Sequence, residues 1–95
     1  MKYSVIKEDQ AIYIDQVSFN GIDLSDTKPF HAFQYNTEFG GEIEFEEKNE
    51  LLNSDSDIKT KTGISLTEYK KRWDKAKLEY ENDPLRKNPE IMPGQ

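Results

Sequence analysis

Few residues of this chain have side chains suited to catalysis or metal binding, and His31 is the only histidine. A catalytic base or a metal-bound imidazole needs partner groups held at matched distances. The chain has no cysteine, so a zinc site would need His31 together with several carboxylates, an unusual ligand set. Neither a glycine-rich phosphate loop nor a nucleophile-elbow or zinc-protease motif occurs. We therefore expect a protein that is not an enzyme and has no cofactor or metal, with His31 on a sheet face.

A run of short polar residues at positions 53–57, Asn-Ser-Asp-Ser-Asp, begins like a calcium-binding loop. The EF-hand pattern requires glycine at its sixth place and glutamate at its twelfth. Those places hold Ile58 and Ile64 in this chain. We interpret the run as an acidic linker.

The densest charge in the chain is acidic, and it consists of Glu42, Glu44, Glu46, Glu47 and Glu50. Paired carboxylates can hydrolyse glycosides, but that chemistry needs a pocket. Alternating glutamates on a strand predict instead a solvated face that resists aggregation. A sharper alternative is that this surface imitates the spacing of phosphates, so that the protein inhibits a host nucleic-acid enzyme by occupying its basic groove.

The segment from Ser65 to Asn82 has the clearest helical pattern. Ser65 and Glu68 have the spacing of a capping box, and Asp83-Pro84 marks the end of the helix. Apolar residues three and four positions apart form a single stripe: Leu66, Tyr69, Trp73, Ala76 and Tyr80. This stripe predicts packing on a sheet or on another subunit. Lysines and Arg72 flank it, as on the solvated side of an amphipathic helix.

The part of the chain before this helix is typical of a small antiparallel sheet of about four strands. Strands are predicted at 2–7, 11–15, 30–35 and 42–46, with Ile12 and Ile14 facing the core. Val17 and Phe19 could continue the second strand after a bend. Gly40-Gly41 predicts a break in a loop, and 47–62 predicts a polar loop in which Leu51-Leu52 forms a short turn. The last two strands would form a hairpin.

The sequence thus indicates one α+β domain over 1–82, followed by an extended proline-rich tail over 83–95. Aromatic residues of the helix, if they are not core, and apolar residues of the tail are the expected partner contacts: Tyr69, Trp73, Tyr80, Leu85, Ile91 and Met92. Large aromatic side chains contribute strongly to protein–protein binding.

Charge and composition restrict the partners. The net charge is −6, with −7 over residues 1–63 and +1 over 64–95, which argues against binding to nucleic acid because phosphate contacts require clustered Lys and Arg. No apolar stretch is long enough to cross a membrane, and the start, MKYSVIKEDQ, lacks the apolar run of a signal peptide. Absence of cysteine is compatible with a cytosolic protein.

One stretch resembles small proteins that tailed bacteriophages encode near their tail, baseplate and tail-fibre genes. The resemblance lies in Ile22-Asp23-Leu24-Ser25, then His31-Ala32-Phe33-Gln34-Tyr35, then Gly41-Glu42-Ile43-Glu44-Phe45. That group commonly has Trp where this chain has Tyr35, and the helix and tail are not part of the match. The resemblance implies a virion-associated or tail-assembly accessory protein, located in the virion or the cytoplasm of the infected host. Its expected partner is a larger virion or tail protein, or a second copy of the chain.

Overall fold

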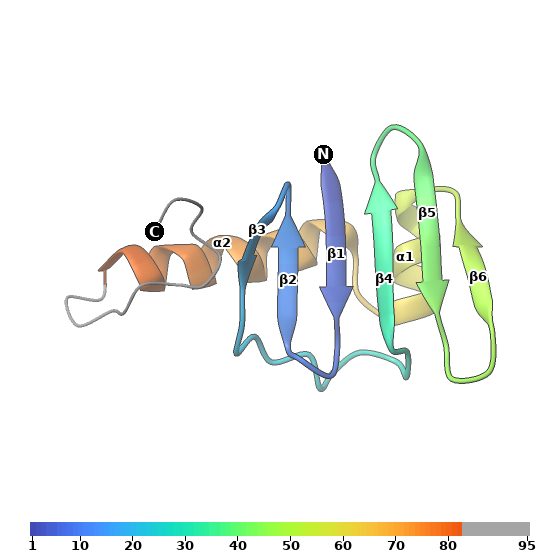
Figure 1. Ribbon diagram of the computed structural model, residues 1–95, viewed down its shortest axis with the longest axis horizontal. Helices are drawn as coiled ribbons and strands as arrows, with labels where there is room; N and C mark the ends of the chain where they lie inside the picture. The colour runs from blue at the N-terminus through green and yellow to red at the C-terminus, as the bar shows by residue number, and fades with distance from the viewer. Residues whose placement is uncertain (83–95) are drawn as a thin grey trace.

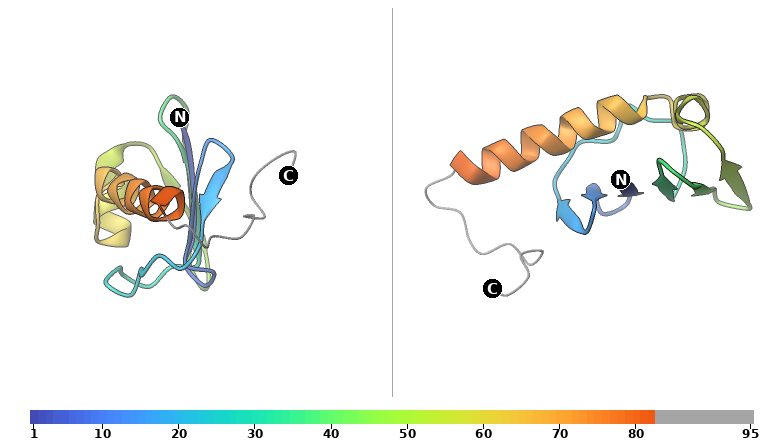
Figure 2. Two further views of the ribbon diagram at one scale, coloured as in Figure 1. Left: turned by 90° about the vertical axis from the view of Figure 1, so that its left-hand side faces the viewer. Right: turned by 90° about the horizontal axis from the view of Figure 1, so that it is seen from above.

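The computed structural model describes residues 1–82, which form a six-stranded antiparallel sheet with two helices on one face (Figures 1 and 2). The strands are β1 (Lys2–Ile6), β2 (Ala11–Ile14), β3 (Val17–Phe19), β4 (Ala32–Asn36), β5 (Gly40–Glu44) and β6 (Asn49–Leu52). The helices are α1 (Asp55–Thr62) and α2 (Leu66–Asn82). The predicted α+β class is confirmed. The predicted numbers of elements, about four strands and one helix, were too low, because residues 1–82 form six strands and two helices. The predicted tail lies outside the described residues.

The sheet consists of two three-stranded meanders that meet at β1 and β4, in the order β3-β2-β1-β4-β5-β6. Ile6 pairs with Ala32 and Lys2 with Asn36 where the meanders join. Strands β3 and β6 are therefore the two edges of the sheet. The predicted hairpin is formed by β4 and β5.

Alternation along the strands divides the sheet into a core face, covered by the helices, and an open face. Val5, Ile12, Phe33 and Ile43 are fully or almost fully buried on the core face, and the pairing register places them in one row across four strands. Burial of Ile12 and Ile14 confirms the predicted orientation of β2. The open face carries the intervening, mostly polar residues.

Gly40 and Gly41 lie inside β5 and not in a loop. A Cβ atom on Gly41 would collide with the backbone of Gln34 and Tyr35 in β4. The glycine therefore allows close approach of two strands, a use of glycine within strands that resembles a loop signal in the sequence.

Helix α1 begins where the polar linker was predicted. Of its residues, only Ile58 and Thr62 are buried, so no apolar periodicity marked it. The helix ends at Gly63, whose φ of 94° is left-handed, as is common after the last helical turn.

Helix α2 agrees closely with the prediction. The Glu68 amide donates to Ser65 Oγ at 3.2 Å, which is one half of the expected capping box. The Glu68 carboxylate instead accepts from Arg72 Nε at 2.9 Å. Figures 1 and 2 show the C-terminal part of α2 extending beyond the edge strand β3.

Candidate protein-binding surfaces

The stripe of α2 that was expected to contact a partner is divided between the core and the edge of the sheet. Tyr69 is 0% exposed, and its ring meets that of Phe33 edge-on with centroids 5.2 Å apart. Tyr69 is therefore a core residue and is not available to a partner.

Trp73 and Tyr80 attach α2 to the edge strand β3. The Trp73 indole N–H donates to the Val17 carbonyl oxygen at 2.9 Å, and its ring lies 5.5 Å from that of Phe19. The Tyr80 ring lies 5.9 Å from the same phenylalanine, and both α2 residues are half-buried. Leu85, Ile91 and Met92, the other expected contacts, lie outside the described residues.

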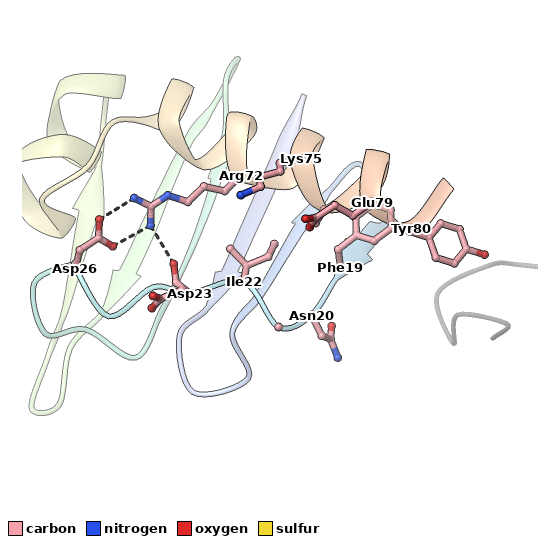
Figure 3. A pocket seen from close by; sticks show the side chains of 11 residues that line it. Phe19, Asn20, Ile22, Asp23, Asp26, Arg72, Lys75, Glu79 and Tyr80 are labelled. Carbon is pink, nitrogen blue, oxygen red and sulfur yellow. Dashed lines mark hydrogen bonds and ion pairs between the residues drawn. The ribbon is translucent and has the colours of Figure 1, made fainter. Parts of the chain in front are cut away.

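A groove of about 710 Å³ separates the end of α2 from the segment that follows β3 (Figure 3). Its apolar lining consists of Phe19, Ile22, Ala76 and Tyr80. Its charged lining consists of Asp23, Asp26, Arg72, Lys75 and Glu79. We call this feature the α2 groove.

Arg72 closes one end of the α2 groove by clamping the segment after β3 to the helix (Figure 3). Its two terminal nitrogens donate to the Asp26 carboxylate at 2.9 and 2.7 Å, and one of them also reaches the Asp23 carbonyl oxygen at 3.1 Å. Hydrogen bonds from Arg72 lower the pKa of Asp26, and the two carboxylates of Asp26 and Glu68 raise the pKa of Arg72. The helical pattern predicted Arg72 on the solvated side of α2, because a partner 46 positions away leaves no local signal in the sequence.

The five glutamates of the acidic run do not share one surface. The pairing of Glu42 with Leu51 and of Ile43 with Glu50 places Glu42 and Glu44 on the open face and Glu50 on the core face. Glu50 accepts from Lys48 and Lys61, each at 2.8 Å, and these bonds lower its pKa to about 2. Glu46 and Glu47 lie in the turn between β5 and β6.

His31 lies beside a second opening, of about 760 Å³, next to Phe30 and Phe45. Its Nδ1 is 3.4 Å from the Glu8 carboxylate. Across residues 1–82 there is no group of three or more side chains placed to hold a metal ion.

The stretch at 53–57 leads into α1. The backbone N–H of Asn53 donates to Asp57 Oδ2 at 2.8 Å. Asp55 and Asp57 lie in the first helical turn, where negative charge is favourable. These carboxylates serve the start of a helix.

No protein-family model, curated protein or solved structure matches this chain. No helix within residues 1–82 is long and apolar enough to cross a membrane. Much of the stretch that resembles phage proteins builds the core, through Leu24, Phe33, Tyr35 and Ile43. These residues are explained by packing of the core, so their positions in the structure do not indicate a function.

Proposed function

We propose that this chain is a non-enzymatic accessory protein that binds a larger protein by adding one of its partner's strands to the free edge of β6. The observation that carries the proposal is the exposure of that edge. Leu51 in β6 is 64% exposed, whereas Ser18, the middle residue of the opposite edge strand β3, is 2% exposed. An exposed edge strand with a large apolar residue is a template for strand addition.

The backbone of β6 is oriented for such pairing. The Phe45 amide donates to the Lys48 carbonyl oxygen at 2.8 Å, and ladder bonds in an antiparallel pair alternate from residue to residue. Glu50 and Leu52 therefore bond to β5, while the N–H and C=O groups of Asn49 and Leu51 point away from the sheet. One of these outward groups is already engaged, because the Leu51 carbonyl oxygen accepts from Lys61 Nζ at 3.3 Å, and an added strand would share or displace this contact. The outward amides of Asn49 and Leu51 make no hydrogen bond within the described part of the chain.

Charge on the open face favours a basic partner segment. Glu42 pairs with Leu51 and Glu44 with Asn49, so both carboxylates lie one strand inward from the β6 edge. A strand added to β6 would lie roughly 10 Å from them, within the reach of lysine and arginine side chains. The preferred occupant is therefore an extended segment with an apolar residue beside Leu51 and Lys or Arg on the open face.

The resemblance to tailed-phage proteins suggests that the partner belongs to a tail or another part of the virion. The alternative, an acidic inhibitor of a nucleic-acid enzyme, stays a prediction. It is less favoured because only Glu42 and Glu44 share the open face of the sheet and Glu50 is neutralised by two lysines.

The decisive experiment compares Leu51→Pro with Leu51→Thr. Proline removes the outward amide without removing a hydrogen bond to β5, and it is tolerated on edge strands. Threonine also removes the leucine side chain, but it keeps that amide and suits a strand. We expect the wild type and Leu51→Thr to co-sediment with purified tail particles and Leu51→Pro not to, with unchanged circular dichroism. Equal co-sedimentation of all three would contradict the proposal.

A second measurement tests the acidic contribution. Reversal of charge at Glu42 and Glu44 should weaken co-sedimentation on the order of tenfold and reduce its dependence on salt. If the same reversal instead abolished inhibition of a host nucleic-acid enzyme and left co-sedimentation intact, the inhibitor reading would replace ours.

A further inference from the structure

We infer that the C-terminal part of α2 pairs antiparallel, across the α2 groove, with α2 of a second copy of this chain. Lys75 of each copy then meets Glu79 of the other. This surface lies at the β3 end of the sheet, at the opposite end from the β6 edge, so the inference does not depend on the proposed function.

The first observation is an ion pair that α2 does not form. The helix contains four pairs of opposite charge at i and i+4, and three of them are made: Glu68–Arg72 at 2.9 Å, Lys70–Asp74 at 3.0 Å and Lys77–Glu81 at 3.9 Å. Lys75 and Glu79 have the same spacing, yet neither forms an ion pair or side-chain hydrogen bond within residues 1–82. The order of charges does not explain this, because the Lys70 and Lys77 pairs have the same order.

The second observation is the position of these two residues. Both are exposed and both line the α2 groove (Figure 3), beside the apolar wall of Phe19, Ile22 and Ala76. The Lys77–Glu81 and Lys70–Asp74 pairs do not line it. Of the formed pairs, only Glu68–Arg72 reaches the groove, through Arg72 alone. Lys75 and Glu79 are therefore the one pair of the four of which both members line it.

The third observation is that this part of α2 packs sparsely on the sheet: Ala76 is partly buried against the core, and Tyr80 lies against Phe19 of β3. The helix passes beyond β3 (Figures 1 and 2), and most of its residues from Asp74 onward are exposed. Helical stability in proteins comes mainly from packing of an apolar face, so a second helix against this sparsely packed part of α2 would stabilise it.

These features are complementary to themselves. A two-fold axis presents the same surface from both subunits and brings residue i against residue j and j against i. An antiparallel arrangement about an axis between Lys75 and Glu79 places each ammonium against the carboxylate of the second copy. The same pairing covers the apolar wall of both grooves. One Lys75–Glu79 ion pair thus forms at each end of a small apolar contact. The two ion pairs together fix how far the two helices are shifted along each other.

The test is sedimentation velocity of the full chain over a range of concentrations, with charge-reversed variants. We expect the wild type to form a dimer, and Lys75→Glu and Glu79→Lys each to raise the dissociation constant on the order of 100-fold, because like charges then face each other. Lys71→Glu makes the same change of charge on the same helix outside the groove, and it should leave dimerisation unchanged.

Mixing the two reversed variants gives the sharpest result. A Lys75→Glu chain presents two acids and a Glu79→Lys chain presents two bases, so an equal mixture should form a heterodimer although neither forms a homodimer. A wild type that stays monomeric overturns the inference. So does a dimer that Lys71→Glu and Lys75→Glu weaken equally, or one that only Leu51→Pro disrupts, because the β6 edges would then form the contact.

Discussion

Tyr69 places a hydroxyl group in a mostly apolar core, near the buried Thr62. The Thr62 hydroxyl donates to the Ile58 carbonyl oxygen, and the Tyr69 oxygen has no partner at hydrogen-bonding geometry within the described residues. A buried polar group without a partner lowers stability by roughly 1–3 kcal/mol. We expect Tyr69→Phe to raise the free energy of unfolding by about 1 kcal/mol, while Tyr69→Ala lowers it by about 3–5 kcal/mol through the cavity it leaves. Urea unfolding measures both, and a destabilised Phe variant would show that the hydroxyl has a partner.

The same hydroxyl predicts how stability depends on pH. Burial raises the pKa of Tyr69 from 10.0 to about 12. Above pH 10 the unfolded chain loses this proton while the folded chain keeps it. The free energy of unfolding is therefore unaffected below that pH and then falls by up to about 1.4 kcal/mol per pH unit until the folded pKa is reached.

Tyr69→Phe should reduce this alkaline slope without abolishing it, because burial also raises the pKa of Tyr3 and Tyr35. Urea midpoints measured on both sides of pH 10 make the comparison. An identical slope in the wild type and the Phe variant would place the titrating group elsewhere.

The two-residue turn between β2 and β3 holds both of its residues in the left-handed region of backbone conformation. Asp15 and Gln16 both have positive φ, 49° and 77°, as a type I′ turn requires. Asp15 also accepts from the Lys2 amide at 2.8 Å, whereas no hydrogen bond of the Gln16 side chain is seen in the described structure. Gln16→Gly should stabilise the protein by about 0.5–1 kcal/mol, measured as a higher urea midpoint. Asp15→Gly should show no such gain, and a loss in both variants would argue against a type I′ turn.

At the scale of elements, Arg72 joins α2 to the segment between β3 and β4. A lysine cannot make the paired bonds to Asp26 and also reach Glu68. We expect Arg72→Lys to lower the free energy of unfolding by about 1–2 kcal/mol and to speed hydrogen exchange in that segment. Lys70→Ala removes an exposed ion pair of the same helix, and its effect should stay below about 0.5 kcal/mol. Equal effects of the two substitutions would mean that the clamp contributes nothing specific.

The elements also show what could be predicted from the sequence. The long helix was predictable because five apolar residues repeat along it, and so was the hairpin of β4 and β5, because Ile43 alternates with glutamates. α1 was not, since Ile58 is its only large apolar residue. β6 was predicted as a turn because two leucines stand side by side in it and do not alternate with polar residues. Only Leu52 of this strand is buried, and Leu51 is exposed.

The candidate site was less predictable than the fold. The helical pattern identified the stripe of α2, but periodicity cannot distinguish residues above the sheet, such as Tyr69, from those beyond its edge, such as Tyr80. That distinction depends on how many strands lie under the helix. The α2 groove and the Arg72 clamp depend likewise on the path of the segment after β3, which no local pattern indicates.

At the scale of the whole molecule, one continuous core links the two meanders, since it includes residues of both, from Ile12 to Leu52, together with Tyr69. Such a core predicts a single cooperative unfolding transition. Trp73 is the only tryptophan and reports on the β3 end of the sheet, where it packs on Phe19. Ile43 is 0% exposed and belongs to β5, in the other meander.

Ile43→Ala therefore tests whether the two ends of the sheet unfold together. We expect a loss of about 2–5 kcal/mol, and the same shift in the urea midpoint whether Trp73 fluorescence or far-ultraviolet circular dichroism is followed. Coincident transitions mean that a destabilising substitution at one end of the sheet, such as one in β6, also lowers the population of folded molecules that is measured at α2. If Trp73 kept the wild-type midpoint while circular dichroism became biphasic, the meanders would be separate units. The effects of substitutions at the β6 edge and at the α2 groove would then have to be measured against two different free energies of unfolding.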